Sequence, residues 1–313
     1  MTDHTPDSKR VDDATGTSLV GHEWDGIEEL DTPLPRWWVY IFVACVVFAA
    51  GYVVVYPAIP DIQGTAGWSS RGDLDAMMKA ETAARAPKLD AIAATPIEAL
   101  AGNPQLMRIA IEGGRAAFKV NCVQCHGAGA AGSRGYPNLN DDDWLWGGDI
   151  AAIQTTLQHG IRSPGHDETR FSQMPAFADI LSKGQIGQLV SHVRVISGQD
   201  GPSRAAQAGT ALFAENCASC HGDTGKGNRE MGSPNLTDGI WLYGGDRAAL
   251  TTTISKARYG VMPHWEGRLP RVTIKMLAAY VHSLGGGEAS PAAAVPAVPD
   301  AAAAPTGEPD VGT

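Results

Sequence analysis

The sequence predicts a mainly α-helical protein, in which one membrane-spanning helix near the N-terminus precedes two tandem copies of a small domain. An uncharged run at residues 37–57 predicts the spanning helix, and matching segments in the second half predict the tandem copies. The 313 residues are 43% hydrophobic and 19% charged, which excludes a fully disordered protein. Acidic residues exceed basic ones only at the two ends, 1–36 and 285–313. The chain therefore offers no dense basic face, and we exclude a nucleic-acid binder.

The run 37–57 is long enough to cross a membrane, since a helix rising about 1.5 Å per residue spans roughly 30 Å over this length. Aromatic residues near both ends suit the two interfaces. The run starts too late and is too long for a cleaved signal peptide, and a buried core helix is the other alternative. Arg36 lies before the run and the next base is Arg71. This bias places the N-terminus in the cytoplasm of a bacterium, as a single-pass inner-membrane protein whose bulk is periplasmic.

The segments flanking the repeated part are simpler. Residues 58–103 form a predicted periplasmic connector, with a helix expected over 71–93. Residues 285–313 are rich in alanine and proline and hold no large side chains to bury, so we expect a disordered tail.

Two copies of one domain lie between these segments, at 104–200 and 201–284. Four pairs of short segments match: GRAAFKVNCVQCHG with GTALFAENCASCHG, WLWGGD with WLYGGD, SQMPAF with GVMPHW, and LVSHVRVISG with LAAYVHSLGG. The loop between the second and third segments is nine residues longer in the first copy. The closing segments show the apolar spacing of a helix.

Each copy contains a Cys-x-x-Cys-His sequence, which is the attachment signal of a c-type haem. Two thiols at this spacing add to the two vinyl groups of one porphyrin edge, and the adjacent imidazole then lies under the iron as proximal ligand. The residues are Cys122, Cys125 and His126, then Cys217, Cys220 and His221. A zinc site or a redox dithiol shares the first four positions, but each pair has its own complete helical repeat. We expect two covalently bound haem c groups.

A methionine followed by proline recurs downstream of each motif, at Met174 and Met262. A thioether on the face opposite histidine is a common distal ligand of haem iron, and proline stiffens the loop that holds the sulfur. The order of the repeats predicts the pairs His126/Met174 and His221/Met262.

Histidines offer an alternative for the distal positions. His159 and His166 lie in the longer loop of the first copy and are able to displace Met174, and His264 follows Met262 by two residues. The repeated aromatic residues of the Trp-Leu-x-Gly-Gly-Asp segments either pack on a porphyrin or belong to the core.

Both repeats resemble class I c-type cytochrome domains over about residues 104–284. The segments GHEWDGIEELDTPLPRWW (21–38) and YPAIPDIQGTAGWSS (56–70), on either side of the apolar run, closely resemble the dihaem subunit III of cbb3-type cytochrome c oxidase, the CcoP/FixP family. The resemblance covers nearly the whole chain apart from the tail. It makes the four motif cysteines the thioether anchors, and the two histidines and two methionines the axial ligands.

The function implied by this resemblance is electron transfer from a periplasmic cytochrome c or a quinol–cytochrome c reductase. The partners implied are a monohaem cytochrome c subunit and a catalytic haem–copper subunit, which reduces oxygen to water in a complex that pumps protons. This chain itself would not be catalytic. Other hypotheses are a membrane-anchored dihaem cytochrome serving a periplasmic dehydrogenase, a dihaem peroxidase and a structural metal-binding module.

Overall fold

The computed structural model describes residues 10–58 and 63–289, so most of the predicted tail lies outside the described residues. The chain divides after Ala84 into two units, each of which is described by itself. The first unit begins with an antiparallel hairpin of β1 (Leu19–Trp24) and β2 (Ile27–Leu30). Its two turn residues, Asp25 and Gly26, have left-handed φ angles of 51° and 83°. The Asp-Gly pair is the sequence signal for such a turn, although the sequence analysis predicts no strand in this segment.

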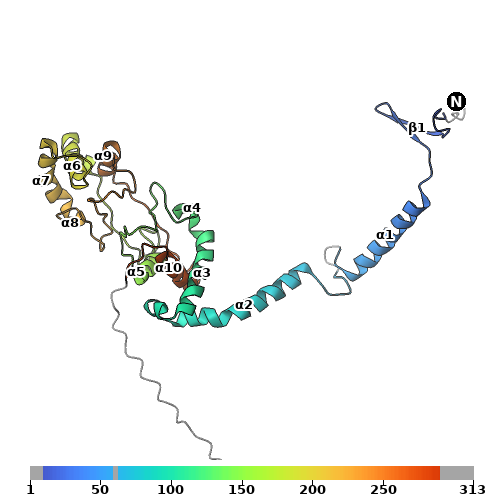
Figure 1. Ribbon diagram of the computed structural model, residues 1–313, viewed down its shortest axis with the longest axis horizontal. Helices are drawn as coiled ribbons and strands as arrows, with labels where there is room; N and C mark the ends of the chain where they lie inside the picture. The colour runs from blue at the N-terminus through green and yellow to red at the C-terminus, as the bar shows by residue number, and fades with distance from the viewer. Residues whose placement is uncertain (1–9, 59–62, 290–313) are drawn as a thin grey trace, which may run out of the picture. The chain divides into compact units, whose positions relative to one another are not determined.

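Helix α1 (Arg36–Val55), blue in Figure 1, confirms the predicted apolar helix, and all its residues are exposed. Within the described part of the chain it is the one helix long and apolar enough to cross a membrane. It is apolar on every side, as expected for a helix whose surroundings are hydrocarbon rather than a protein core on one face. Helix α2 (Ser70–Ala94) confirms the connector helix, and the short 3-10 helix η1 (Ile97–Gly102) follows it.

The second unit carries the same series of α-helices twice, in agreement with the sequence repeat, and the first copy has the short 3-10 helix η2 in addition. The first copy contributes α3 (Pro104–Asn121), α4 (Val123–His126), α5 (Ile150–His159), η2 (Phe177–Asp179) and α6 (Lys183–Ile196). The second contributes α7 (Arg204–Asn216), α8 (Ala218–His221), α9 (Arg247–Lys256) and α10 (Arg271–His282). Corresponding helices also share their caps: the side chains of Asp149 and Asp246, which close the repeated tryptophan segments, accept backbone N–H groups at the starts of α5 and α9.

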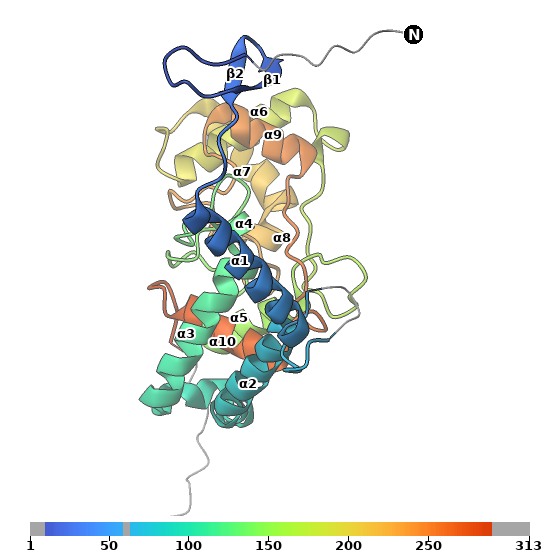
Figure 2. The same cartoon turned by 90° about the vertical axis from the view of Figure 1, so that its right-hand side faces the viewer.

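The closing helices of the two repeats are exchanged. Helix α10 packs on α3 and α5, whereas α6 packs on α7 and α9. Figures 1 and 2 both show α3, α5 and α10 in one group and α6, α7 and α9 in another. Each compact half of the second unit therefore combines the first helices of one repeat with the closing helix of the other. We call them the α3 half and the α7 half.

A glycine at the same repeat position permits both exchanged contacts. A Cβ on Gly114 of α3 would overlap the backbone of Met276 in α10, and a Cβ on Gly209 of α7 would overlap the backbone of Gln188 in α6. These crossings are too close for any side chain at the glycine position. The repeated glycine of the motif segments thus marks the same helix crossing in both halves.

Each half has its own apolar core. In the α3 half, Leu100, Phe118, Ile274 and Leu277 are almost fully buried. In the α7 half, the buried residues are Phe177, Ile186, Leu189, Val190, Val193, Phe213, Leu250 and Ile254. The predicted spacing of the first closing helix is confirmed, because its apolar residues face this second core.

The first five residues of the predicted disordered tail are ordered. Trp144 Nε1 donates to the carbonyl oxygen of Gly286 at 2.6 Å, and Glu288 N donates to the carbonyl oxygen of Gly148 at 2.9 Å. The Glu288 carboxylate also accepts from Gly148 N and pairs with Arg229. These polar contacts hold residues 285–289 although the segment has no large apolar side chain.

Candidate functional site

The Cys-x-x-Cys-His motifs fold as one tight helical turn each. Cys122 ends α3 and precedes α4, and His126 N donates to the carbonyl oxygen of Cys122 at 2.9 Å. Cys217 stands at the same junction of α7 and α8, where His221 N makes the same bond at 2.9 Å. Since one helical turn carries both thiols and the imidazole, all three groups are available to a single flat ligand.

The thiols are not in the environment of a redox centre. The four motif cysteines form no disulfide with one another. Burial, with a smaller effect from the second thiol of each pair, raises the pKa of Cys122 and of Cys217 to about 11. Reactive dithiols instead have thiolates stabilised by positive surroundings. This argues against the redox-dithiol alternative.

Both motif histidines have one ring nitrogen fixed by a backbone carbonyl. Nδ1–H of His126 donates to the carbonyl oxygen of Pro137 and that of His221 to Pro234, each at 3.1 Å. Burial lowers the pKa of both rings, so they are neutral at pH 7. With Nδ1 protonated, the lone pair is on Nε2, which is the arrangement of a histidine that binds a metal.

The two carbonyl acceptors were missed by the sequence reasoning. They belong to a further repeated triplet, Pro-Asn-Leu, at 137–139 and 234–236. Its asparagines form the turns that follow: Asn138 Oδ1 accepts from Asn140 N at 3.0 Å, and Asn235 Oδ1 accepts from Thr237 N at 2.9 Å. Searching for every matching triplet of the two copies would have found them.

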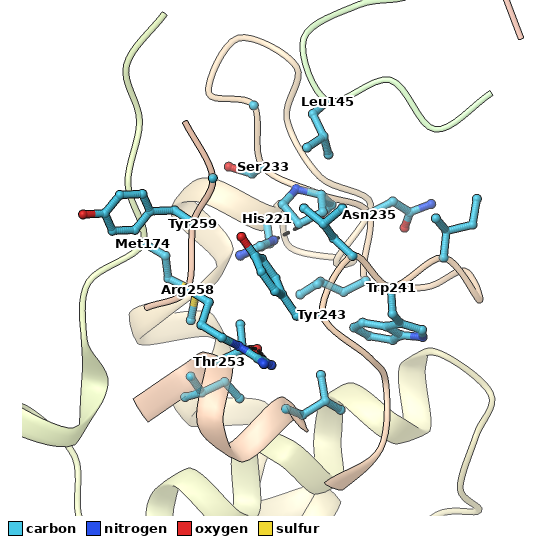
Figure 3. A pocket seen from close by; sticks show the side chains of 18 of the residues that line it. Leu145, Met174, His221, Ser233, Asn235, Trp241, Tyr243, Thr253, Arg258 and Tyr259 are labelled. Atoms are coloured by element: carbon cyan, nitrogen blue, oxygen red, sulfur yellow. Dashed lines mark hydrogen bonds between the residues drawn. The ribbon is translucent and has the colours of Figure 1, made fainter. Parts of the chain in front are cut away.

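A cavity of about 720 Å³ opens beside His221 in the α7 half (Figure 3). Cys217, Cys220 and His221 line it together with Met174. Its apolar wall includes Leu189, Val193, Phe213, Leu236, Trp241, Leu250 and Ile254. The volume is in the range of cofactor sites, and the donors are two thiols, a neutral imidazole and a thioether. This cavity fits a covalently attached haem.

Met174 reaches this cavity from the first repeat and packs against the core of the α7 half. Sequence order predicts the pair His126 with Met174, whereas the structure has Met174 lining the cavity of His221. The physical reason is the exchange: the chain after α5 crosses to the α7 half before η2 and α6. Met174 lies on that crossing segment and arrives beside the histidine of the other repeat.

Met262 makes the reciprocal crossing. It packs against the core of the α3 half, which contains Phe118 and Cys122, and the Phe118 and His126 rings are 6.5 Å apart. Its backbone pairs with Ile161, N–H to carbonyl in both directions, at 2.9 and 3.0 Å. Met262 therefore lies in the half that contains His126, and it is not among the residues that line the His221 cavity.

Cationic side chains line the polar part of the His221 cavity. Arg258 lies over the Tyr243 ring at 4.8 Å, and its Nη2 donates to the carbonyl oxygen of Ala249 at 2.7 Å. Arg162 donates from Nε to the carbonyl oxygen of Gly260 and from Nη1 to that of Ser172, at 2.7 and 2.8 Å. Arg162 therefore ties together the two crossing segments. Both cations suit the carboxylates of a haem edge.

The histidines offered as alternatives to Met174 do not line its cavity. His159 Nδ1 lies 2.9 Å from His166 Nε2, and the His166 ring stacks on His264 at 4.6 Å. In the part of the chain that the structure describes, these three rings form a group of their own. Trp144 packs against the core of the α3 half and Trp241 against that of the α7 half, so the repeated tryptophan is a wall residue in both.

Two protein-family models match this chain, one over the N-terminal segment and one over the two repeats. The family described as the N-terminal domain of cytochrome oxidase-cbb3, FixP, matches residues 16–63. The family described as cytochrome c oxidase, cbb3-type, subunit III, matches residues 110–193 and 204–281.

Curated relatives match almost end to end. The cbb3-type cytochrome c oxidase subunit CcoP of Cereibacter sphaeroides is 52% identical over 86% of this chain and 95% of its own. The FixP subunit of Azorhizobium caulinodans is 50% identical over 92% of this chain and 99% of its own. The FixP subunit of Rhizobium meliloti is 48% identical, over 90% and 98%.

Proposed function

This chain belongs to the CcoP/FixP family, subunit III of cbb3-type cytochrome c oxidase, and from that premise we propose that it passes electrons through two covalently bound haem c groups to the catalytic subunits. Family membership makes it an electron-transfer subunit with cytochrome c domains that works with other oxidase subunits. Because the chain belongs to this family, we set aside the two alternatives of a cytochrome that serves a periplasmic dehydrogenase and of a dihaem peroxidase.

The observation that carries the haem proposal is the His221 cavity. Its donors are Cys217, Cys220, His221 and Met174, and its walls are apolar. Cys217 and Cys220 would hold the porphyrin as thioethers, and His221 Nε2 and the Met174 sulfur would be the ligands of its iron. A haem in this setting supplies one-electron transfer at iron, and Met/His ligation raises its potential. The apolar walls would pack against the porphyrin faces.

By the same reasoning, the first haem belongs to Cys122, Cys125, His126 and Met262. Support comes from the repeated geometry: the same helical turn, the same carbonyl partner for Nδ1 and a crossing methionine packed on the same core as Phe118 and Cys122. Each haem is then held by the cysteines and histidine of one repeat and the methionine of the other. If the two repeats separated, each iron would lose its methionine ligand.

The proposed orientation follows from the charges around α1. Arg36 at its N-terminal end favours a cytoplasmic location for residues 1–36 and a periplasmic one for both halves of the second unit. Electrons would arrive from a periplasmic cytochrome c or a quinol–cytochrome c reductase. They would leave towards the haem–copper subunit, with the monohaem cytochrome c subunit as a further partner. Oxygen reduction and proton pumping belong to the assembled complex.

Gentle purification from membranes tests this proposal. We expect one haem-staining band at the mass of this chain and co-elution of a haem–copper subunit and a second haem-staining subunit. Purification with a periplasmic dehydrogenase in place of a haem–copper subunit would contradict the role in the oxidase.

A further inference from the structure

A cluster of two histidines and two carboxylates lies where the long loop of the first repeat, 160–170, meets the second repeat. His159 ends α5, His166 and Glu168 lie in the loop, and Glu266 comes from the second repeat. Each offers one ligand atom, and these four atoms all lie within 4.8 Å of one another. None of them takes part in the haem sites proposed above.

The spacing is close to that of a bound metal ion. His159 Nδ1 lies 2.9 Å from His166 Nε2 and 3.2 Å from Glu168 Oε2. Ligands bound tetrahedrally at about 2.0–2.2 Å from a metal lie roughly 3.4 Å apart. Two of the separations are thus near this value, and the remaining pairs of ligand atoms lie within 4.8 Å.

The histidine rings are held by their neighbours before any ion arrives. The His166 ring stacks between His159, at 5.2 Å, and His264, at 4.6 Å. Ser163 Oγ in turn lies 2.8 Å from His264 Nδ1 and accepts His264 N–H at 3.1 Å. Such outer contacts fix ligand orientation in metal sites.

We propose that His159, His166, Glu168 and Glu266 bind one divalent transition-metal ion of the zinc type. Two imidazoles with two carboxylates suit Zn²⁺ and its neighbours in the first transition row. Mg²⁺ and Ca²⁺ prefer an all-oxygen shell, so the two imidazoles select against them. The ligands come from both repeats, and the ion therefore links them.

The ion would link α5 and its following loop to the segment that carries Met262. Trp265 N donates to the carbonyl oxygen of Leu157 at 2.9 Å, and Glu266 N to that of Gln158 at 3.2 Å, so the segment already lies along the end of α5. An ion bound by Glu266 and His159 stabilises the contact between this segment and the end of α5, a few residues from Met262. The role of Met262 as an iron ligand rests on the proposed function, whereas the metal site does not.

Zinc titration of the full-length haem-loaded chain in detergent, purified without a histidine tag, tests the site. We expect one Zn²⁺ per chain by calorimetry, undisturbed by excess Mg²⁺. Glu168→Gln and His166→Ala should each weaken binding at least about tenfold. Glu168 is 73% exposed, so its substitution leaves the core intact. His192→Ala, on α6 in the other half, is the matched control and should bind as the wild type does.

Two results would overturn the metal site and leave only a hydrogen-bonded cluster. The first is that the wild-type chain does not bind Zn²⁺ stoichiometrically. The second is that Glu168→Gln, His166→Ala and His192→Ala bind Zn²⁺ with equal affinity. Hydrogen exchange tests separately whether the bound ion stabilises the Met262 segment. Zn²⁺ should slow exchange of the Met262, Trp265 and Glu266 amides in the wild type but not in Glu168→Gln. Binding without slower exchange would overturn the link to Met262, whatever the state of the haem proposal.

Discussion

Met174 and His221 line one cavity, although the methionine belongs to the first repeat and the histidine to the second (Figure 3). Met262 makes the reciprocal crossing into the core that contains Cys122. The two repeats are therefore interlocked through their closing helices, and each proposed haem site draws on both.

The first prediction concerns haem content. Two motif turns with the same histidine geometry imply two thioether-linked haems. Under denaturing conditions, the intact mass should exceed that of the chain by two haems. Replacing Cys217 and Cys220 with serine should remove one of them, and a wild-type excess of one haem or none would contradict the proposal.

The second prediction concerns topology. Helix α1, with Arg36 at its start, should leave the second unit in the periplasm. Protease added to spheroplasts should then digest the haem-staining part of the chain while a tag at the N-terminus survives. Protection of the haem-staining part would reverse the orientation.

The third prediction concerns the close approach of Gly160 to the Met262 segment. Gly160 has a φ of +69°, and a Cβ there would lie 2.5 Å from the Met262 carbonyl oxygen. Gly160→Ala should lower the free energy of unfolding by about 1–3 kcal/mol and weaken the sulfur-to-iron absorption band. Gly165→Ala is the matched control, because Gly165 has a φ of +73° in the same loop but open space around it. Equal effects of the two substitutions would show that backbone strain, rather than contact with Met262, is responsible.

The fourth prediction is a pH dependence at Asp143. Burial, and then the carboxylates of Asp238, Asp141 and Asp142, raise its pKa from 3.8 to about 6. The ionised form is therefore disfavoured in the folded state, so this group's contribution to stability is full below about pH 4 and is lost as the pH rises to about 6. Asp143→Asn should raise the thermal midpoint relative to wild type at pH 8, and most of that gain should vanish at pH 4. The exposed Asp223→Asn should show no such difference. A gain for Asp143→Asn that is the same at both pH values would refute ionisation of this half-buried carboxyl as its cause.

Much of the fold follows from local sequence signals. The apolar run gave α1, the repeated Asp at the end of each tryptophan segment caps α5 and α9, and the Cys-x-x-Cys-His turns appear where expected. The hairpin was missed, although Asp25-Gly26 is a turn signal. The ordering of residues 285–289 could not be predicted, because it rests on contacts of Trp144 and Gly148 with residues distant in the chain.

The exchange of closing helices could not be predicted for a different reason. The two repeats have nearly the same apolar spacing and the same glycine at the helix crossing, Gly114 and Gly209. These local patterns therefore do not indicate whether α6 or α10 packs on α3. The choice depends on the path of the two crossing segments, where Ile161 pairs with both Arg170 and Met262.

The fifth prediction tests that exchange through the irons. A chain with Cys122→Ser and Cys125→Ser keeps only the haem on Cys217 and Cys220, so its far-red sulfur-to-iron band reports one site. Adding Met174→Leu to this chain should abolish the band and lower the potential, because thioether ligation favours ferrous iron. Adding Met262→Leu should leave both unchanged.

The reciprocal chain, with Cys217→Ser and Cys220→Ser, should lose its band with Met262→Leu and keep it with Met174→Leu. Two methionine substitutions in each of the two cysteine backgrounds make four variants. Comparing their sulfur-to-iron bands is the most direct measurement of which methionine binds the same iron as which histidine. Loss of the band with Met174→Leu on the Cys217/Cys220 haem is the result that we predict. Loss with Met262→Leu on that same haem would contradict the exchange and restore the pairing within each repeat.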